Sequence, residues 1–170
     1  VQRPRADVTV AFNFCYCVFL AREEMLRYAR SARRGLGPEG VFILDMHGGT
    51  ETLEEVEEST DHGTFTYVWD QHPVNPISHR GKRYIHFRFP DGTQLKRAFT
   101  YDWRLWSIPE VTDILYESGY SDVQVYWEGT DTKTGEGNGV FRRTNRGDDA
   151  EALAHLAWHG LVGVAEKSLP

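Results

Sequence analysis

Two short groups of polar and aromatic residues follow apolar segments of the sequence and have side chains that could do chemistry. Asp45 and His47 end one apolar run, and Asn13 and Tyr16 follow another. Carboxylate and imidazole groups can take a proton from a reacting atom, and histidine changes charge near neutral pH. We therefore regard Asp45 and His47 as candidates for acid–base catalysis. The alternatives are that Asp45 caps a turn, that His47 is a surface side chain without a role, and that Asn13 satisfies turn backbone.

Aromatic side chains are concentrated in the middle of the chain. Tyr67 and Trp69 occupy alternate positions of an expected strand, so they share one face of it. Such side chains can wall a pocket, stack on a flat or cationic ligand, or fill the core between two layers. We interpret most of them as core, and we keep Tyr101, Trp103 and Arg104 as candidates for binding a substrate.

These residues need a scaffold, and the N-terminal part of the chain predicts one. Val8–Phe12 and Val41–Asp45 are short apolar runs typical of strands, and the apolar positions of 21–36 recur at mostly helical spacing. A glycine- and proline-rich stretch at 35–40 ends the helix. Strand, crossover helix and strand form a βαβ unit with parallel strands. Ligands bind beyond the carboxyl ends of such strands, which is where the two groups of candidate residues fall.

The pattern changes to a period of two in the middle of the chain. The three segments that read as strands are Thr64–Gln71, Lys82–Phe89 and Gln94–Tyr101. Pro90–Thr93 reads as a hairpin turn between the last two. We predict an antiparallel β insertion of about three strands over residues 63–104. The acidic stretch at 50–62 is predicted as a solvated helix or loop.

Helical spacing returns after Ser107, which can cap a helix with Pro109 and Glu110 in its first turn before Gly119 ends it. The remaining predicted elements are a strand at 122–128, a glycine-rich loop at 129–139, a short segment at 140–142, a helix opened by Asp148 and Asp149, and a last strand at 160–165.

Composition and charge exclude several classes of protein. The 170 residues are 40% hydrophobic and 13% aromatic, which predicts one folded domain over 1–170. A net charge of −6 opposes a phosphate-binding surface, so we expect no nucleic-acid partner. No apolar run approaches the ~20 residues of a membrane span, so we expect no membrane partner. Cys15 and Cys17 would share one face of a strand, which suits neither a disulfide framework nor a metal site. We interpret them as reduced core thiols of a cytoplasmic protein.

The order of these elements resembles a known family. The strand ending in F-N-F-C-Y, the helix after it and the run L-G-P-E-G-V-F-I-L-D resemble the fourth strand, the next helix and the "L-x-P-G-G-x-F-x-x-D" fifth strand of class I S-adenosylmethionine-dependent methyltransferases. Glu39 replaces the usual first glycine of that turn. The segment Tyr101–Gly119 and the run E-S-G-Y-S-D-V-Q-V-Y resemble the family's next helix and sixth strand. The resemblance implies a partial Rossmann-like sheet of the family's strands 4, 5, 6 and 7, with the antiparallel β insertion.

The resemblance also implies a function and a set of site residues. The cofactor is S-adenosylmethionine, with Phe12, Asn13 and Phe14 against its methionine end and Tyr16 facing the methyl acceptor. The reaction is methyl transfer to a small molecule, for which the protein positions the reactants and excludes water. The alternative is a non-catalytic binding or interaction module.

The cofactor-binding half of the family has no counterpart in this sequence. The glycine-rich turn after the first strand and the acidic residue that holds the ribose are both missing, and Gly135–Gly139 follows no buried strand, so it reads as a flexible loop. We expect this chain to be a C-terminal fragment that supplies the acceptor side of the pocket and is inactive alone. Val8–Phe12 is then expected at a sheet edge, where it pairs with the missing half or with a second copy.

Overall fold

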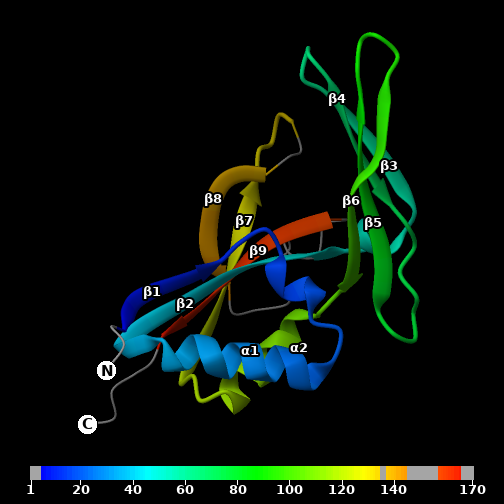
Figure 1. Ribbon diagram of the computed structural model, residues 1–170. Coiled ribbons are helices and arrows are strands. Elements are labelled where there is room, and N and C mark those ends of the chain that lie inside the picture. The colour runs from blue at the N-terminus through cyan, green and yellow to red at the C-terminus, as the bar shows by residue number, and fades with distance from the viewer. Residues whose placement is uncertain (1–4, 135–136, 145–156, 166–170) are drawn as a thin grey trace.

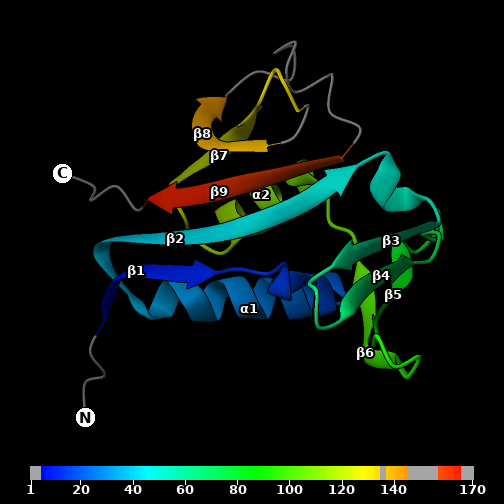
Figure 2. The same cartoon turned by 90° about the horizontal axis from the view of Figure 1, so that it is seen from above.

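The computed structural model describes residues 5–134, 137–144 and 157–165, and it shows an α/β fold with two sheets. The larger sheet has five strands in the order β1-β2-β9-β7-β8, and the smaller has four in the order β3-β4-β5-β6. The smaller sheet stands beside the larger one, and α1 and α2 lie together under one face of the larger sheet (Figures 1 and 2). This arrangement confirms the predicted α/β sheet with an antiparallel β insertion.

The N-terminal βαβ unit forms as predicted. Its elements are β1 (Ala6–Ala11), the short 3₁₀ helix η1 (Cys15–Val18), α1 (Arg22–Arg34) and β2 (Leu36–Gly49). β1 and β2 pair in parallel. Phe42, Leu44 and Met46 alternate along β2 and are fully buried in the core with the helices. Asp45 and His47 each follow one of these residues by a single position, so their side chains are on the opposite face of the sheet.

The C-terminal elements complete the larger sheet. They are α2 (Ile108–Glu117), β7 (Asp122–Thr130), β8 (Gly137–Thr144) and β9 (Ala157–Ala165). α2 begins as predicted, because Ser107 Oγ accepts the backbone N–H of Glu110 and the Glu110 carboxylate accepts the N–H of Ser107. β9 lies between β2 and β7 and is antiparallel to both. The helix predicted to begin at Asp148 lies outside the described residues.

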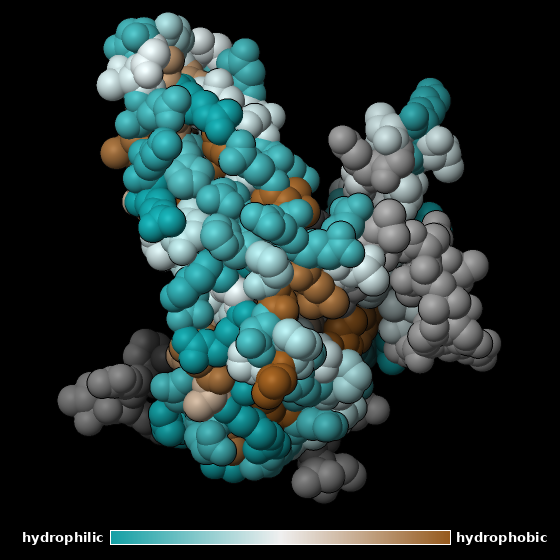
Figure 3. Space-filling model, turned by 90° about the vertical axis from the view of Figure 1, so that its right-hand side faces the viewer, coloured by the Kyte–Doolittle hydropathy of each residue, from teal (hydrophilic) through white to brown (hydrophobic). Residues whose placement is uncertain are grey.

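The insertion is an antiparallel sheet of four strands. They are β3 (Val56–Asp61), β4 (Thr66–Gln71), β5 (Arg80–Arg88) and β6 (Gln94–Arg104). The turn predicted between the last two is present, with the Phe89 N–H donating to the Thr93 carbonyl at 2.9 Å. On the side of the insertion turned toward the viewer in Figure 3, the surface is mostly hydrophilic.

The prediction of a helix or loop at 50–62 was wrong. The segment contains the single 3₁₀ turn η2 (Glu51–Leu53) and then β3, so the sheet begins at Val56 rather than near residue 63. β3 is an edge strand whose residues are exposed except for a half-buried Val56. A short edge strand whose side chains are mostly exposed does not require alternating apolar residues, so the sequence carried no period-two signal.

Three further boundaries differ from the sequence prediction. β2 extends past Asp45 to Gly49 because β9 pairs with it as far as Gly49 and Ala157. The glycine-rich loop and the short segment after it form most of a hairpin, in which β7 runs to Thr130 and β8 begins at Gly137. Cys15 and Cys17 lie in a 3₁₀ turn rather than on one face of a strand, and both are free thiols. Only Cys17 is in the core, whereas Cys15 is exposed.

β1 is an edge strand of the larger sheet, as predicted. It pairs with β2 alone among the described strands. Val8 is 56% exposed and Val10 is 53% exposed, whereas Ala11 is buried. The side chains of β1 that point away from the helices are therefore apolar and open to solvent.

Candidate functional site

A cavity of about 400 Å³ lies between the larger sheet and the insertion. Its walls come from the loop after β1, the end of β2, η2, and strands β3, β4 and β6. The lining residues are Phe14, His47, Glu51, Thr52, Val56, Glu58, Tyr67, Trp69, Gln71 and Trp103. The cavity thus opens at the carboxyl end of the parallel β1–β2 pair, where α/β sheets bind ligands.

The loop after β1 enters the cavity in an unusual backbone conformation. Asn13 and Phe14 have φ angles of 61° and 53°, in the left-handed region that bulky side chains rarely adopt. The Asp45 carboxylate accepts the backbone N–H of Asn13 at 2.8 Å and that of Phe14 at 2.9 Å. Charge-assisted hydrogen bonds of this kind hold the strained pair in place. Asp45 therefore caps the turn, which is the structural alternative considered for it, and both of its oxygens are occupied.

The left-handed pair places the Phe14 ring against two other lining residues. The ring centroid of Phe14 is 5.1 Å from that of His47 and 6.2 Å from that of Trp103, the latter in an edge-on arrangement. His47, Phe14 and Trp103 come from three separate segments of the chain, and the fold brings them into one wall.

Aromatic side chains of the insertion continue this wall beyond Trp103. Trp69 and Trp103 have ring centroids 5.9 Å apart, and Tyr101 packs behind Trp103 at 5.1 Å. Tyr67 is on the same face of β4 as Trp69 and also lines the cavity. Trp103 is only 7% exposed, so it serves both as core and as cavity wall.

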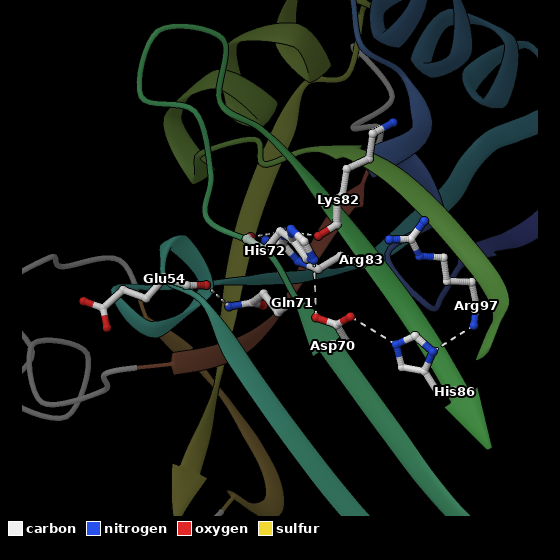
Figure 4. Close-up of polar contacts among 8 residues, drawn as sticks. All are labelled: Glu54, Asp70, Gln71, His72, Lys82, Arg83, His86 and Arg97. Atoms are coloured by element: carbon white, nitrogen blue, oxygen red, sulfur yellow. Dashed lines mark hydrogen bonds and ion pairs between the residues drawn. The ribbon is translucent and has the colours of Figure 1, made fainter. Parts of the chain in front are cut away.

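Polar contacts fix η2 as another wall (Figure 4). Gln71 Nε2 donates to the carbonyls of Glu51 at 2.7 Å and Glu54 at 2.9 Å. The fully buried guanidinium of Arg83 donates to the carbonyl of Thr52 at 2.9 Å, and also to the carbonyls of His72, just after β4, and Lys82 in β5. Burial lowers the pKa of Arg83 to about 10. Gln71 and Arg83 together attach η2 to the insertion sheet.

Some predicted site residues lie elsewhere. Tyr16 is fully buried in the core and does not line the cavity, and burial raises the pKa of its hydroxyl well above the usual value. The Arg104 guanidinium lies 3.7 Å from the centre of the Trp106 ring and pairs with Glu110 at 3.0 Å, away from the cavity lining. Phe12 is 49% exposed, and it precedes the left-handed pair at the end of β1.

Sequence reasoning missed four polar lining residues: Glu51, Thr52, Glu58 and Gln71. Three of them come from the segment predicted as a solvated helix or loop, and Gln71 was treated only as the end of a strand. The acidic composition of the segment was visible, but its docking on β4 depends on long-range contacts that have no local signal.

Comparison with known proteins identifies the fold. No protein-family model matches the sequence, and no curated protein matches it significantly. Solved structures do match. The methyltransferase CcbJ from Streptomyces caelestis is similar over 96% of this chain and 62% of its own, with a TM-score of 0.67 at 15% identity. CalS10 from Micromonospora echinaspora, an amino pentose methyltransferase solved with S-adenosylmethionine bound, covers 98% of this chain and 61% of its own, with a TM-score of 0.62 at 12% identity.

DesVI from Streptomyces venezuelae gives the same result, with a TM-score of 0.62 at 14% identity over 96% of this chain and 60% of its own. The chain therefore has the fold of class I S-adenosylmethionine-dependent methyltransferases, as the sequence resemblance predicted. It spans about 60% of the length of DesVI. In the part of the chain that the structure describes, no helix has the length and apolar character needed to cross a bilayer.

Proposed function

We propose that this chain forms the acceptor side of an S-adenosylmethionine-dependent methyltransferase that acts on a small molecule. The observation that carries the proposal is the position of the cavity, which opens where β1 and β2 of a methyltransferase fold end. A volume of about 400 Å³ is within the range of small-molecule sites. The aromatic walls suit a compact organic acceptor.

The residues at the end of β1 fit the cofactor. Phe12 and Asn13 are exposed there, and the backbone of Asn13 and Phe14 is fixed by Asp45. These three residues would hold the methionine end of S-adenosylmethionine, whose sulfonium supplies an electrophilic methyl group. Because the left-handed pair is already held by hydrogen bonds, the backbone needs no rearrangement to present this surface.

The side chains that line the cavity would orient the acceptor, exclude water and remove a proton. Phe14, Trp69 and Trp103 exclude water from the acceptor and limit its orientation, which is the main requirement of an in-line transfer. His47 lines the same cavity beside Phe14, where an imidazole nitrogen can take a proton from the attacking atom of the acceptor. The Asp45 carboxylate is committed to the loop, so the proposed base is His47.

We also propose that the β1 edge pairs with a further strand in the working protein. Its outward side chains Val8 and Val10 are apolar and exposed, and an unpaired edge of this kind is a template for strand addition. The same observation favours the second candidate function, a non-catalytic interaction module. A protein without transfer activity that still pairs through β1 would support that reading.

Methyl transfer from tritium-labelled S-adenosylmethionine tests the proposal in the protein expressed from its full gene. We expect transfer to a small organic acceptor, and we expect Trp103→Phe to weaken it through a higher KM. Tyr116→Phe is the matched control, because Tyr116 is an exposed aromatic residue of α2. Absence of transfer to any acceptor in a broad panel, with cofactor binding intact, would contradict the proposal.

A further inference from the structure

The amide of Gln71 is held in one orientation. Gln71 is only 4% exposed, and its Nε2 donates to two backbone carbonyls, which can only accept hydrogen bonds. The nitrogen must therefore face η2, and exchanging the nitrogen and oxygen of the amide would place an acceptor against two acceptors. Oε1 is on the other branch of the amide, and no hydrogen-bond donor among the described residues is paired with it.

Because Gln71 lines the cavity, its Oε1 is a fixed acceptor available to a ligand. A ligand that places an N–H or O–H group there can donate a hydrogen bond to an oxygen that is paired with no donor among the described residues. Gln71 can therefore have two roles. Its amide nitrogen attaches η2 to the insertion sheet, and its amide oxygen is available to accept a hydrogen bond from a ligand.

The other polar groups of the cavity also present hydrogen-bond acceptors. Glu51 and Glu58 bring two carboxylates to its rim, and the Thr52 hydroxyl donates to the Gly49 carbonyl at 2.7 Å, so it presents lone pairs. No residue that lines the cavity in the described part of the chain is lysine or arginine. Arg83 is behind the wall, where it donates to the Thr52 carbonyl.

The aromatic side chains also favour a cationic ligand over an anionic one. The faces of Trp69 and Trp103 carry the negative part of the ring quadrupole, which attracts cations. A carboxylate or phosphate ligand would instead meet Glu51 and Glu58, and no lysine or arginine lines the cavity in the described part of the chain to offset their charge.

Resting on the proposed methyl transfer, we infer that the acceptor molecule carries a protonated amine, and that Gln71 is the residue that determines this specificity. The ammonium group donates to Gln71 Oε1, lies near the two carboxylates and is flanked by the indole rings. Recognition of the ammonium group requires only residues of this chain, so it is measurable without the cofactor.

Three probes of nearly equal shape test whether the cavity selects a cationic, a neutral or an anionic ligand: 2-phenylethylammonium, 2-phenylethanol and phenylacetate. Each is titrated into the 170-residue chain, with fluorine NMR of 5-fluorotryptophan-labelled protein reporting on Trp69 and Trp103. We expect the ammonium probe to bind at least about tenfold more tightly than the alcohol, since a hydrogen bond to a charged group contributes about 1.5–3 kcal/mol. We expect no saturable binding of phenylacetate. Equal binding of ammonium and alcohol, or tighter binding of phenylacetate, would overturn the inference.

Two variants test whether Gln71 and Glu58 cause the preference for the ammonium probe. Gln71→Met removes the acceptor oxygen at similar volume and should abolish the preference for the ammonium probe. Because it also frees two carbonyls and can destabilise η2, Glu58→Gln provides a second test at an exposed position. Glu57→Gln is its matched control, since Glu57 is the adjacent residue on the other face of β3 and pairs with Arg88 at 2.9 Å.

We expect Glu58→Gln to reduce the ammonium-to-alcohol ratio by about threefold or more and Glu57→Gln to leave it unchanged. An unchanged ratio in both Gln71→Met and Glu58→Gln would overturn the inference. The outcome is separable from that of the proposed function. Selective ammonium binding in a protein that transfers no methyl group would refute the function alone, and transfer only to neutral or anionic acceptors would refute the inference alone.

Discussion

The Asp45 carboxylate accepts the backbone N–H of Phe14 at 2.9 Å, and this contact fixes a residue with a φ angle of 53°. A carboxylate on β2 thereby determines where an aromatic ring from the end of β1 is placed. The ring lies between His47 and Trp103, so the shape of the cavity depends on a residue that does not line it. Removing Asp45 should change both the stability and the cavity.

We expect Asp45→Ala to lower the free energy of unfolding by about 2–3 kcal/mol, because two charge-assisted hydrogen bonds to strained backbone are lost. Asp45→Asn keeps one acceptor oxygen and should lose about half as much. Urea denaturation measures both changes. Asp113→Ala, at an exposed position of α2, is the control and should have little effect. An Asp45→Ala variant as stable as the parent would show that the carboxylate does not hold the loop.

The two cysteines should differ in reactivity. Cys15 is exposed and Cys17 is fully buried, so we expect iodoacetamide to modify Cys15 in the native protein and Cys17 only after unfolding. Mass spectrometry of the alkylated peptides distinguishes the sites. Rapid modification of both in the folded protein would contradict the placement of Cys17 in the core.

Cys17 should also make the fold sensitive to alkali. Burial raises the pKa of the Cys17 thiol to about 12, whereas a thiol in an unfolded chain has a pKa of about 8.5. The folded state therefore retains a proton that the unfolded state loses between these values. The contribution of Cys17 to stability is fully present below about pH 8.5 and falls as the pH rises toward 12. The difference in unfolding free energy between the parent and Cys17→Ala should shrink over this range. A difference independent of pH would refute the prediction.

His86 should exist as a single neutral tautomer. Its Nδ1 accepts the backbone N–H of Arg97 at 2.8 Å, and its Nε2 lies 3.0 Å from an Asp70 oxygen (Figure 4). Arg97 has a φ angle of 51° and lies where the pairing of β5 and β6 is irregular, so the imidazole replaces a missing sheet hydrogen bond. We expect nitrogen NMR to show the proton of neutral His86 on Nε2. A proton on Nδ1, or rapid exchange between the two forms, would contradict this geometry.

The exposed β1 edge should cause the isolated chain to associate. We expect light scattering to give a mass above 19.5 kDa at high protein concentration. Val10→Lys should shift the chain toward monomer, because a charge on an edge strand opposes pairing. Val140→Lys is the matched control, since Val140 is a similarly exposed valine on β8 at the other edge. A parent chain that is monomeric at high concentration would contradict the prediction.

Local patterns in the sequence predicted the elements with strong local signals. The βαβ unit, the Ser107 cap, the strand that contains Tyr67 and Trp69 and the turn before Thr93 all have turn residues or periodic apolar positions that depend on near neighbours. β3 was missed because nearly all of its side chains are exposed and none repeats an apolar pattern. The length of β2 was underestimated because its last residues are strand only through pairing with β9.

The site was predicted less completely than the fold, for a similar reason. His47, Phe14 and Trp103 were recognised from their positions near strand ends or in the aromatic segment. Tyr16 was predicted to face an acceptor, but the 3₁₀ turn directs it into the core. Gln71 was not recognised, because its significance depends on carbonyls 17 and 20 residues away in the chain.

Calorimetric titration of S-adenosylmethionine tests most directly whether this chain is the acceptor side of a methyltransferase. The glycine-rich turn and the ribose-binding carboxylate of that fold have no counterpart in the 170 residues, and they supply much of the affinity for the cofactor. We predict that the chain alone binds the cofactor only weakly, and that the protein expressed from its full gene binds it in the low micromolar range. Low-micromolar binding by the 170-residue chain alone, or no binding by the full protein, would contradict the account.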